Sequence, residues 1–111
     1  MDTRIVYTGN EKPVMVTERF NRTTLRYIPY DIVEDNGAYS WRYVLLTPDN
    51  FNYEGMVDAI IGSKYELKSA LAIISNYLLD PKDSDYKKEF DEFQEWRMFA
   101  KDEAKKYFNR K

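Results

Sequence analysis

Residues 47–50 read Thr47-Pro48-Asp49-Asn50, and they separate two different patterns of hydrophobic residues. Before them, β-branched and aromatic residues form short runs separated by turn residues, as is typical of strands. After them, apolar residues recur every three or four positions, as in amphipathic helices. Because proline fixes φ and lacks a backbone N–H, a strand is expected to end here. The sequence therefore predicts a sheet first and helices second.

Four strands are predicted before this boundary. Asn36-Gly37 is the strongest turn signal, because both central residues of a type I′ hairpin turn have positive φ. In the last strand, Tyr39, Trp41 and Tyr43 alternate with other residues and share one face, which we expect to meet the helices. The predicted strands cover residues 4–8, 14–20, 23–32 and 38–47, and they form an antiparallel β-meander.

Two helices are predicted between the boundary and the next proline, Pro81. The first is expected to end at Gly62, since glycine suits the left-handed residue that often follows a helix. Ser63 and Glu66 have the spacing of a capping box, which predicts that Ser63 starts the second helix. This helix reaches about Leu79, and its predicted buried side consists of Leu67, Ala70, Leu71, Ile74 and Leu78.

A long third helix is predicted from Asp83-Ser84-Asp85 to about Phe108, with negative charge at the end where the macrodipole favours it. Its predicted buried side chains fall within an arc of about 120°. They are Tyr86, Phe90, Phe93, Trp96, Ala100, Ala104, Tyr107 and Phe108. Strands followed by helices predict a single α+β domain over residues 1–111. Residues 1–48 are mainly strands in this prediction, and residues 52–109 are mainly helices that cover one face of a sheet of three or four strands.

The composition excludes much of enzyme chemistry. The 111 residues contain no Cys and no His, and 17 basic side chains balance 19 acidic ones. Thiolate nucleophiles, Ser-His-Asp triads and structural zinc sites are therefore excluded. A carboxylate-dependent enzyme ranks third among the functional classes, and we predict a protein that is not an enzyme and has no cofactor. Surface scaling gives roughly 6,500 Å² of exposed surface for a folded chain of this mass, which allows one core.

Two acidic clusters could bind Ca²⁺, because carboxylates on loops are ligands for hard cations. The cluster before the third helix fails the EF-hand pattern and is explained by its place at a helix start, and the cluster beside the hairpin turn is explained as solvated turn carboxylates. We predict no metal site. The clusters are Asp80, Asp83 and Asp85, and Asp31, Glu34 and Asp35.

Nucleic-acid binding is the alternative function. Arg22, Arg26 and Arg42 lie among aromatic residues in the strands, and a sheet of this kind could bind single-stranded nucleic acid. Against this, Arg42 has opposite parity to Trp41 and Tyr43, which puts it on the other face of the strand. A helix-turn-helix at Gly62-Ser63 is also disfavoured, because the second helix is largely apolar.

Five residues are candidates for binding a partner: Trp41 and Tyr43 in the fourth strand, and Arg97, Met98 and Phe99 in the third helix. Met98 and Phe99 lie off the predicted core stripe among charged residues, which indicates a dimer contact or a docking surface unless another segment covers them. Arg97 lies inside the apolar arc. We expect its stem to pack on the neighbouring aromatic rings and its head to reach an acidic group or a carbonyl of another element, or else a partner molecule.

A set of residues from Tyr53 onward points to a family. They are Tyr53, Val57-Asp58-Ala59-Ile60-Ile61, Lys64-Tyr65, Ala72-Ile73, Asn76-Tyr77, Glu89-Phe90, Phe93, Trp96-Arg97 and Ala100-Lys101. Together they resemble small proteins of unknown biochemical role that are encoded in the structural and tail-end modules of phages and prophages. The resemblance implies no catalytic residue. It implies an accessory or structural protein that works through contacts with a protein partner or with further copies of itself.

The expected location follows from this resemblance and from hydropathy. No run approaches the roughly 20 apolar residues that cross a bilayer, and Met1-Asp2-Thr3-Arg4 does not begin a signal peptide. We therefore expect neither export nor a membrane anchor. The predicted location is the cytoplasm of a bacterial host or the virion.

Overall fold

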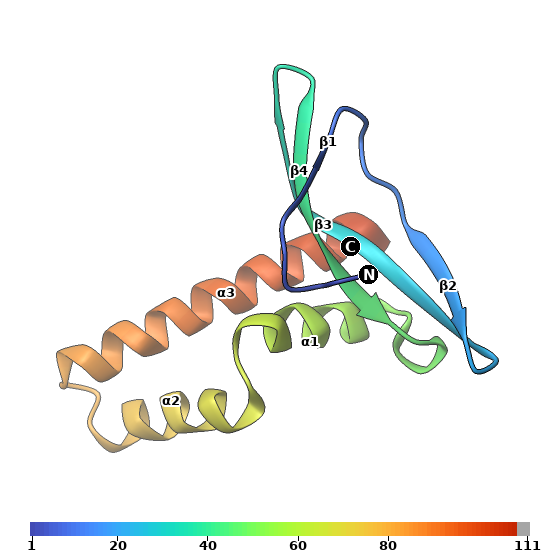
Figure 1. Cartoon of the computed structure of the whole chain (residues 1–111). Coiled ribbons are helices and arrows are strands. Elements are labelled where there is room, and N and C mark those ends of the chain that lie inside the picture. Colours follow the sequence, from blue (N-terminus) through green and yellow to red (C-terminus); the bar gives the residue numbers. More distant parts are fainter. Residues whose placement is uncertain (109–111) are drawn as a thin grey trace.

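A computed structural model describes residues 1–108, and its class is the predicted α+β (Figure 1). The strands are β1 (Tyr7–Gly9), β2 (Val16–Phe20), β3 (Thr23–Asp35) and β4 (Ala38–Leu46). The short 3₁₀ helix η1 (Pro48–Asn50) follows at the predicted boundary, and then α1 (Tyr53–Lys64), α2 (Leu67–Leu79) and α3 (Ser84–Phe108). The predicted limit of the helical region at residue 109 lies outside the described residues.

All pairs in the four-stranded sheet are antiparallel, and the strand order is β1-β4-β3-β2. β2, β3 and β4 form a meander, whereas β1 joins the far edge beside β4. The residues of both hairpin turns have positive φ: 48° and 67° at Asn21-Arg22, and 52° and 83° at Asn36-Gly37. The predicted hairpin at Asn36-Gly37 is therefore confirmed.

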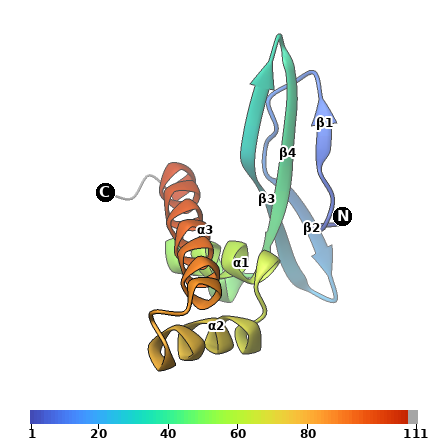
Figure 2. The same ribbon diagram turned by 90° about the vertical axis from the view of Figure 1, so that its left-hand side faces the viewer.

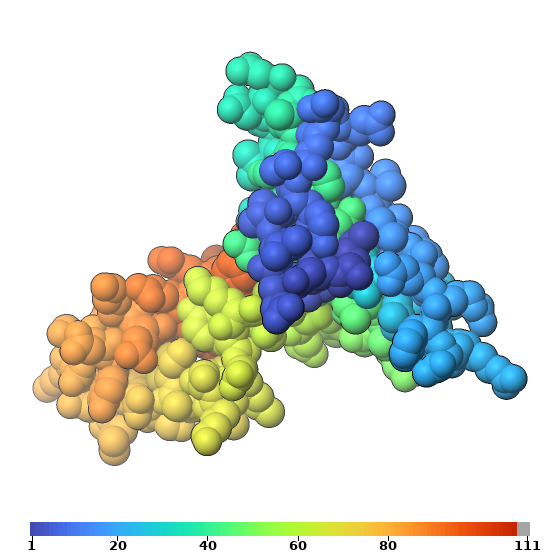
Figure 3. All heavy atoms as spheres, viewed as in Figure 1, coloured from blue at the N-terminus to red at the C-terminus, as the bar shows by residue number. Residues whose placement is uncertain are grey.

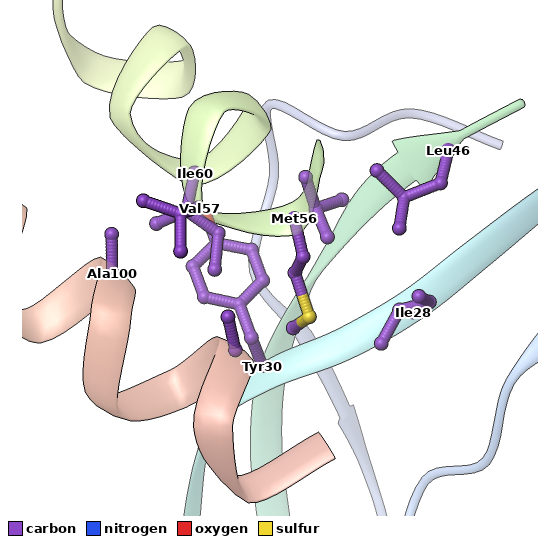
Figure 4. Packing of buried hydrophobic residues seen from close by; sticks show 9 residues of the cluster. Ile28, Tyr30, Leu46, Met56, Val57, Ile60 and Ala100 are labelled. Atoms are coloured by element: carbon purple, nitrogen blue, oxygen red, sulfur yellow. The ribbon is translucent and has the colours of Figure 1, made fainter. Parts of the chain in front are cut away.

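The core lies between one face of the sheet and the helices α1 and α3. Figure 2 shows the helices on one side of the sheet and the edge strand β1 beside β4, away from the helices. Figure 4 shows side chains of β3, β4, α1 and α3 meeting in this layer. The buried cluster consists of Ile28, Tyr30, Val44, Leu46, Met56, Val57, Ile60, Ala100 and Ala104. One continuous core of this kind stabilises a single domain.

The expectation that the aromatic face of β4 meets the helices is wrong. Val44 and Leu46 belong to the core under the helices, so the alternating residues Trp41 and Tyr43 point to the opposite face. There the ring of Tyr7 lies against them, with centroid distances of 6.4 Å to Trp41 and 5.1 Å to Tyr43. Both faces of β4 carry apolar side chains, so alternation alone did not decide which face the helices cover.

The predicted junction between the first two helices is also wrong. α1 continues through Gly62 to Lys64, and Tyr65 is its C-cap. Ser63 does not cap α2, because its hydroxyl donates to the carbonyl oxygen of Ile60 within α1 at 2.6 Å. The ring of Tyr65 packs edge-on against Phe93 of α3, with centroids 5.0 Å apart. This packing fixes the position of Tyr65, the residue that ends α1.

The start of α3 is as predicted. The Asp83 carboxylate accepts hydrogen bonds from the backbone N–H groups of Asp85, at 2.9 Å, and Tyr86, at 3.1 Å. A carboxylate at this position satisfies donors that have no partner within the helix and also suits the macrodipole. The acidic residues here therefore have a structural role.

The buried face of α3 departs from the predicted arc near its C-terminal end. Tyr107 is 38% exposed, whereas Glu103, which was not predicted to be buried, is only 8% exposed. Along its 25 residues, α3 contacts α2 through Phe90, α1 through Trp96 and the segment after η1 through Phe108. The buried side of α3 changes along the helix because a different element packs on each part. A single helical stripe therefore does not describe the buried residues of α3.

Candidate protein-interaction surface

α2 carries two apolar faces. The first faces α3: Ala70 is buried, and the ring of Tyr77 stacks on Phe90 with centroids 4.1 Å apart. The second face lies roughly 80° further around the helix axis. It consists of Leu67, Leu71, Ile74 and Leu78, and is called the leucine stripe below.

The leucine stripe is open to solvent. Leu67, Leu71 and Leu78 are 77%, 55% and 72% exposed, and Ile74 is half-buried. The prediction that these leucines belong to the core is therefore wrong, although Ala70 is buried as predicted. α2 packs mainly on α3. Periodicity reports that one side of a helix is apolar, but it does not report whether another element is there to cover it.

The arm formed by α2 and the first half of α3 projects away from the sheet (Figure 3). The radius of gyration is 16.1 Å, whereas a compact chain of this length has about 13 Å. The accessible surface is 7974 Å², which exceeds the typical value for a monomer of this mass by about 1,500 Å². The molecule therefore exposes much more surface than a compact monomer of its size.

Charged side chains are unevenly distributed over this arm. The solvent side of α3 carries the exposed residues Lys87, Lys88, Asp91 and Glu92. Lys68, in contrast, is the one charged residue within Leu67–Leu79. A monomeric protein normally covers an exposed helix face with charges, and contiguous apolar patches mark interaction sites. The charge distribution therefore makes α2, rather than α3, the candidate interaction surface.

Met98 and Phe99, the predicted interface pair on α3, have different surroundings. Met98 is 66% exposed. Phe99 is half-buried at the margin of the core, with its ring centroid 6.5 Å from Tyr30 and 4.9 Å from Trp96. The two side chains therefore do not form one exposed patch, and the larger apolar surface lies on α2.

Arg97 makes its described contacts within α3. Its Nη1 donates to Oε1 of Gln94 at 2.9 Å, and its guanidinium lies 5.9 Å from the ring centroid of Phe93. The expected packing on an aromatic ring is present. The partner of the head is a side chain of the same helix, however, and not an acidic group or a carbonyl of another element.

Trp41 and Tyr43, the predicted interface residues on β4, lie beside the N-terminal strand β1, on the face of the sheet away from the helices. Tyr43 is buried and Trp41 is half-buried. The Trp41 ring packs on Gly9, and its indole N–H is buried without a hydrogen-bond partner among the described residues. These rings belong mainly to a second, smaller apolar cluster that Tyr7, Trp41 and Tyr43 form across the β1–β4 pair.

Tyr27 lies on the face of the sheet that is turned away from the helices. Its ionisation predicts that the stability of the protein depends on pH. Burial of the side chain, together with the nearby negative charge of Glu18, raises the pKa of the Tyr27 phenol above its usual value. The folded state then retains the proton more strongly than the unfolded state, so stability falls as the pH rises past about 10. Between about pH 8 and pH 11, the free energy of unfolding in urea is expected to fall less for Tyr27→Phe than for the wild type. The two proteins share every other titrating group, so the difference reports on the Tyr27 phenol. Equal losses would contradict this assignment.

A cavity of about 580 Å³ lies between residues 12–15, β3 and the last turns of α3. Its one acidic group is Glu103, and both carboxylate oxygens are engaged. One accepts the backbone N–H of Asp31 at 2.6 Å, and the other pairs with Lys106 at 2.9 Å. Within residues 1–108, no three acidic side chains come together as a metal site. The cavity therefore offers no free carboxylate for acid–base chemistry.

The sheet arginines and the outer aromatic rings do not share one surface. The Arg26 guanidinium lies 4.7 Å from the ring centroid of Phe51, on the side of the helices. Arg42 alternates with Trp41 and Tyr43 and therefore lies on the opposite face of β4. Stacking of bases on aromatic rings beside a basic groove needs both groups on one face. The arrangement gives the nucleic-acid alternative no support.

Comparisons with protein-family models, with curated proteins and with solved structures found no match to this chain. Among the described residues, none of the helices combines the length and apolar character that crossing a bilayer requires.

Proposed function

We propose that this chain is a non-enzymatic protein-binding or assembly protein encoded by a phage or a mobile element. The observation that carries the proposal is the open leucine stripe on a helix with a single charged residue. An exposed apolar surface of this kind costs solubility in a free monomer and gains free energy when a protein covers it. In this proposal the chain acts in the bacterial cytoplasm or in the virion.

The resemblance to phage structural-module proteins supports the same class of function. An accessory protein of that kind works by contact, and the arm formed by α2 and the first half of α3 can reach a partner that does not touch the sheet. The excess of about 1,500 Å² of exposed surface is also large enough for a standard interface, which takes about 800 Å² from each partner.

The test is lysine cross-linking with mass spectrometry in cells that carry the native element. We expect the chain in species above its 13.3 kDa monomer mass, with Lys64, Lys68 or Lys82 linked to a second polypeptide, because these lysines lie on or beside α2. A chain that remains at monomer mass, with links only within itself, would contradict the proposal. Retention of such a monomer on single-stranded DNA that weakens with salt would favour the nucleic-acid alternative instead.

A further inference from the structure

We infer that the leucine stripe binds the leucine stripe of a second copy of this chain, so that two α2 helices pack antiparallel about a two-fold axis. This inference rests on the proposed function and specifies its partner. It starts from the spacing of the stripe: Leu67, Leu71, Ile74 and Leu78 follow one another at intervals of four, three and four residues. This is the alternation of the a and d positions along the seam between two packed helices.

The exposed area fits a dimer. α2 has 13 residues and is therefore about 20 Å long, enough for four layers of interlocking side chains. The excess exposed surface of the whole molecule is about twice what one partner contributes to a standard interface, and the exposed stripe is part of that surface. Because the solvent side of α3 is charged, that helix stays outside. The expected arrangement joins the two arms through their α2 helices, with the charged solvent side of each α3 left exposed.

Charge favours the antiparallel direction. In a parallel pair, the two Lys68 side chains would lie beside each other, and the helix dipoles would point the same way. In an antiparallel pair, the two Lys68 side chains lie at opposite ends of the helix pair, and the dipoles of the two helices point in opposite directions. The stripe is also symmetric about its centre, so Leu67 faces Leu78 of the second copy and Leu71 faces Ile74 of the second copy. An isologous contact of this kind closes on itself and gives a dimer.

The first experiment measures the mass of the purified full chain by light scattering and sedimentation. We expect twice the 13.3 kDa monomer mass at concentrations of about 100 µM, corresponding to a Kd in the micromolar range or below. Leu71→Glu is expected to weaken the dimer at least tenfold, because each copy places a charge near the two-fold axis. Leu71 is 55% exposed in the free chain, so this variant is expected to fold, as circular dichroism will show.

Leu79→Glu is the matched control. Leu79 is on the same helix and is 82% exposed, but it lies about 110° from the centre of the leucine stripe. The dimer mass of this variant is expected to be unchanged. Mixing Leu71→Glu with Leu71→Lys is expected to restore a dimer, because the charges at the axis become opposite. A monomeric wild-type chain, or a dimer that Leu79→Glu breaks and Leu71→Glu does not, would overturn the inference.

The direction of packing is tested with cysteines, which the natural chain lacks. Under oxidation, an equimolar mixture of the Leu67→Cys and Leu78→Cys variants is expected to form a disulfide between unlike chains. Either variant alone is expected to remain uncross-linked. Cross-linking of each variant to itself would show a parallel pair and overturn the antiparallel arrangement. A purified chain that is monomeric, but that links to another polypeptide through α2 in cells, would refute the dimer while leaving the proposed function intact.

Discussion

Replacing Gly55 with alanine is expected to destabilise the protein by about 3 kcal/mol, although the same replacement usually stabilises a helix. Gly55 lies in the first turn of α1, and its N–H donates to the side chain of the N-cap residue Asn52 at 2.7 Å. A Cβ at this position would overlap the carbonyl oxygen of Asn50 and lie 2.7 Å from the carbonyl carbon. The obstacle is backbone rather than a flexible side chain, so η1 or α1 must move.

Movement here is costly because η1 connects β4 to α1 and contacts both β3 and α1. The turn is held by Asn50, whose side-chain oxygen accepts the backbone N–H of Thr47 at 2.6 Å. One residue after Gly55, Met56 is fully buried in the core. A shift of α1 that relieves the overlap would therefore also disturb the packing of Met56, and tightly packed interiors do not absorb such shifts freely.

Gly62→Ala is the matched control for this prediction. Gly62 is also helical and in α1, but an added Cβ would meet nothing within 4 Å. This variant is expected to be more stable than the wild type by about 0.5–1 kcal/mol, because alanine loses less backbone entropy in a helix. Urea unfolding of the three proteins measures both effects. If the two substitutions changed stability in the same direction, the predicted collision between a Cβ at position 55 and the backbone of Asn50 would be contradicted.

Glu103→Ala is expected to lower the free energy of unfolding by about 3 kcal/mol. This is the upper range for a substitution that removes a hydrogen bond to a charged group and leaves the other partner unsatisfied. Glu103 is 8% exposed, and its carboxylate accepts the backbone N–H of Asp31 at 2.6 Å. Asp31 has a positive φ of 54° at an irregularity in the pairing of β3 with β4. The carboxylate thus joins the C-terminal half of α3 to the bulged part of the sheet.

Two further variants separate the hydrogen bond from the charge. Glu103→Gln retains an acceptor for the Asp31 N–H and is expected to lower the free energy of unfolding by about 1 kcal/mol, since Lys106, its partner in the lost ion pair, is 77% exposed. Asp102→Ala changes an exposed neighbour and is expected to lie within about 0.5 kcal/mol of the wild type. Equal stabilities of the alanine variants at 102 and 103 would show that Glu103 does not anchor α3.

The leucine stripe links the fold to its proposed role. A two-helix arm has one internal interface, so only one face of α2 can be covered by α3. The second face needs another molecule to be buried. Because this surface is already formed in the free chain, binding would order few additional residues, which reduces the entropy cost of association.

Local chemistry in the sequence was sufficient to determine the elements and their order. Pro48 ends the sheet because it lacks an N–H, Asn36-Gly37 turns the hairpin because it accepts positive φ, and Asp83 starts α3 because its carboxylate caps free N–H groups. Each of these effects acts over a few residues. The same patterns placed the leucines of α2 in the core, so they predicted Met98 and Phe99 as the candidate interface and did not point to the exposed surface of α2.

Only the tertiary structure decided which apolar surfaces are covered. Leu67, Leu71 and Leu78 have the spacing of core residues and are exposed, whereas Glu103 is charged and buried. A periodic pattern describes one element, but burial depends on whether a second element, distant in sequence, reaches that face. α3 reaches one face of α2, and β1 rather than a helix reaches the aromatic face of β4. The buried carboxylate likewise depends on the Asp31 N–H, 72 residues away in the chain, which no local pattern specifies.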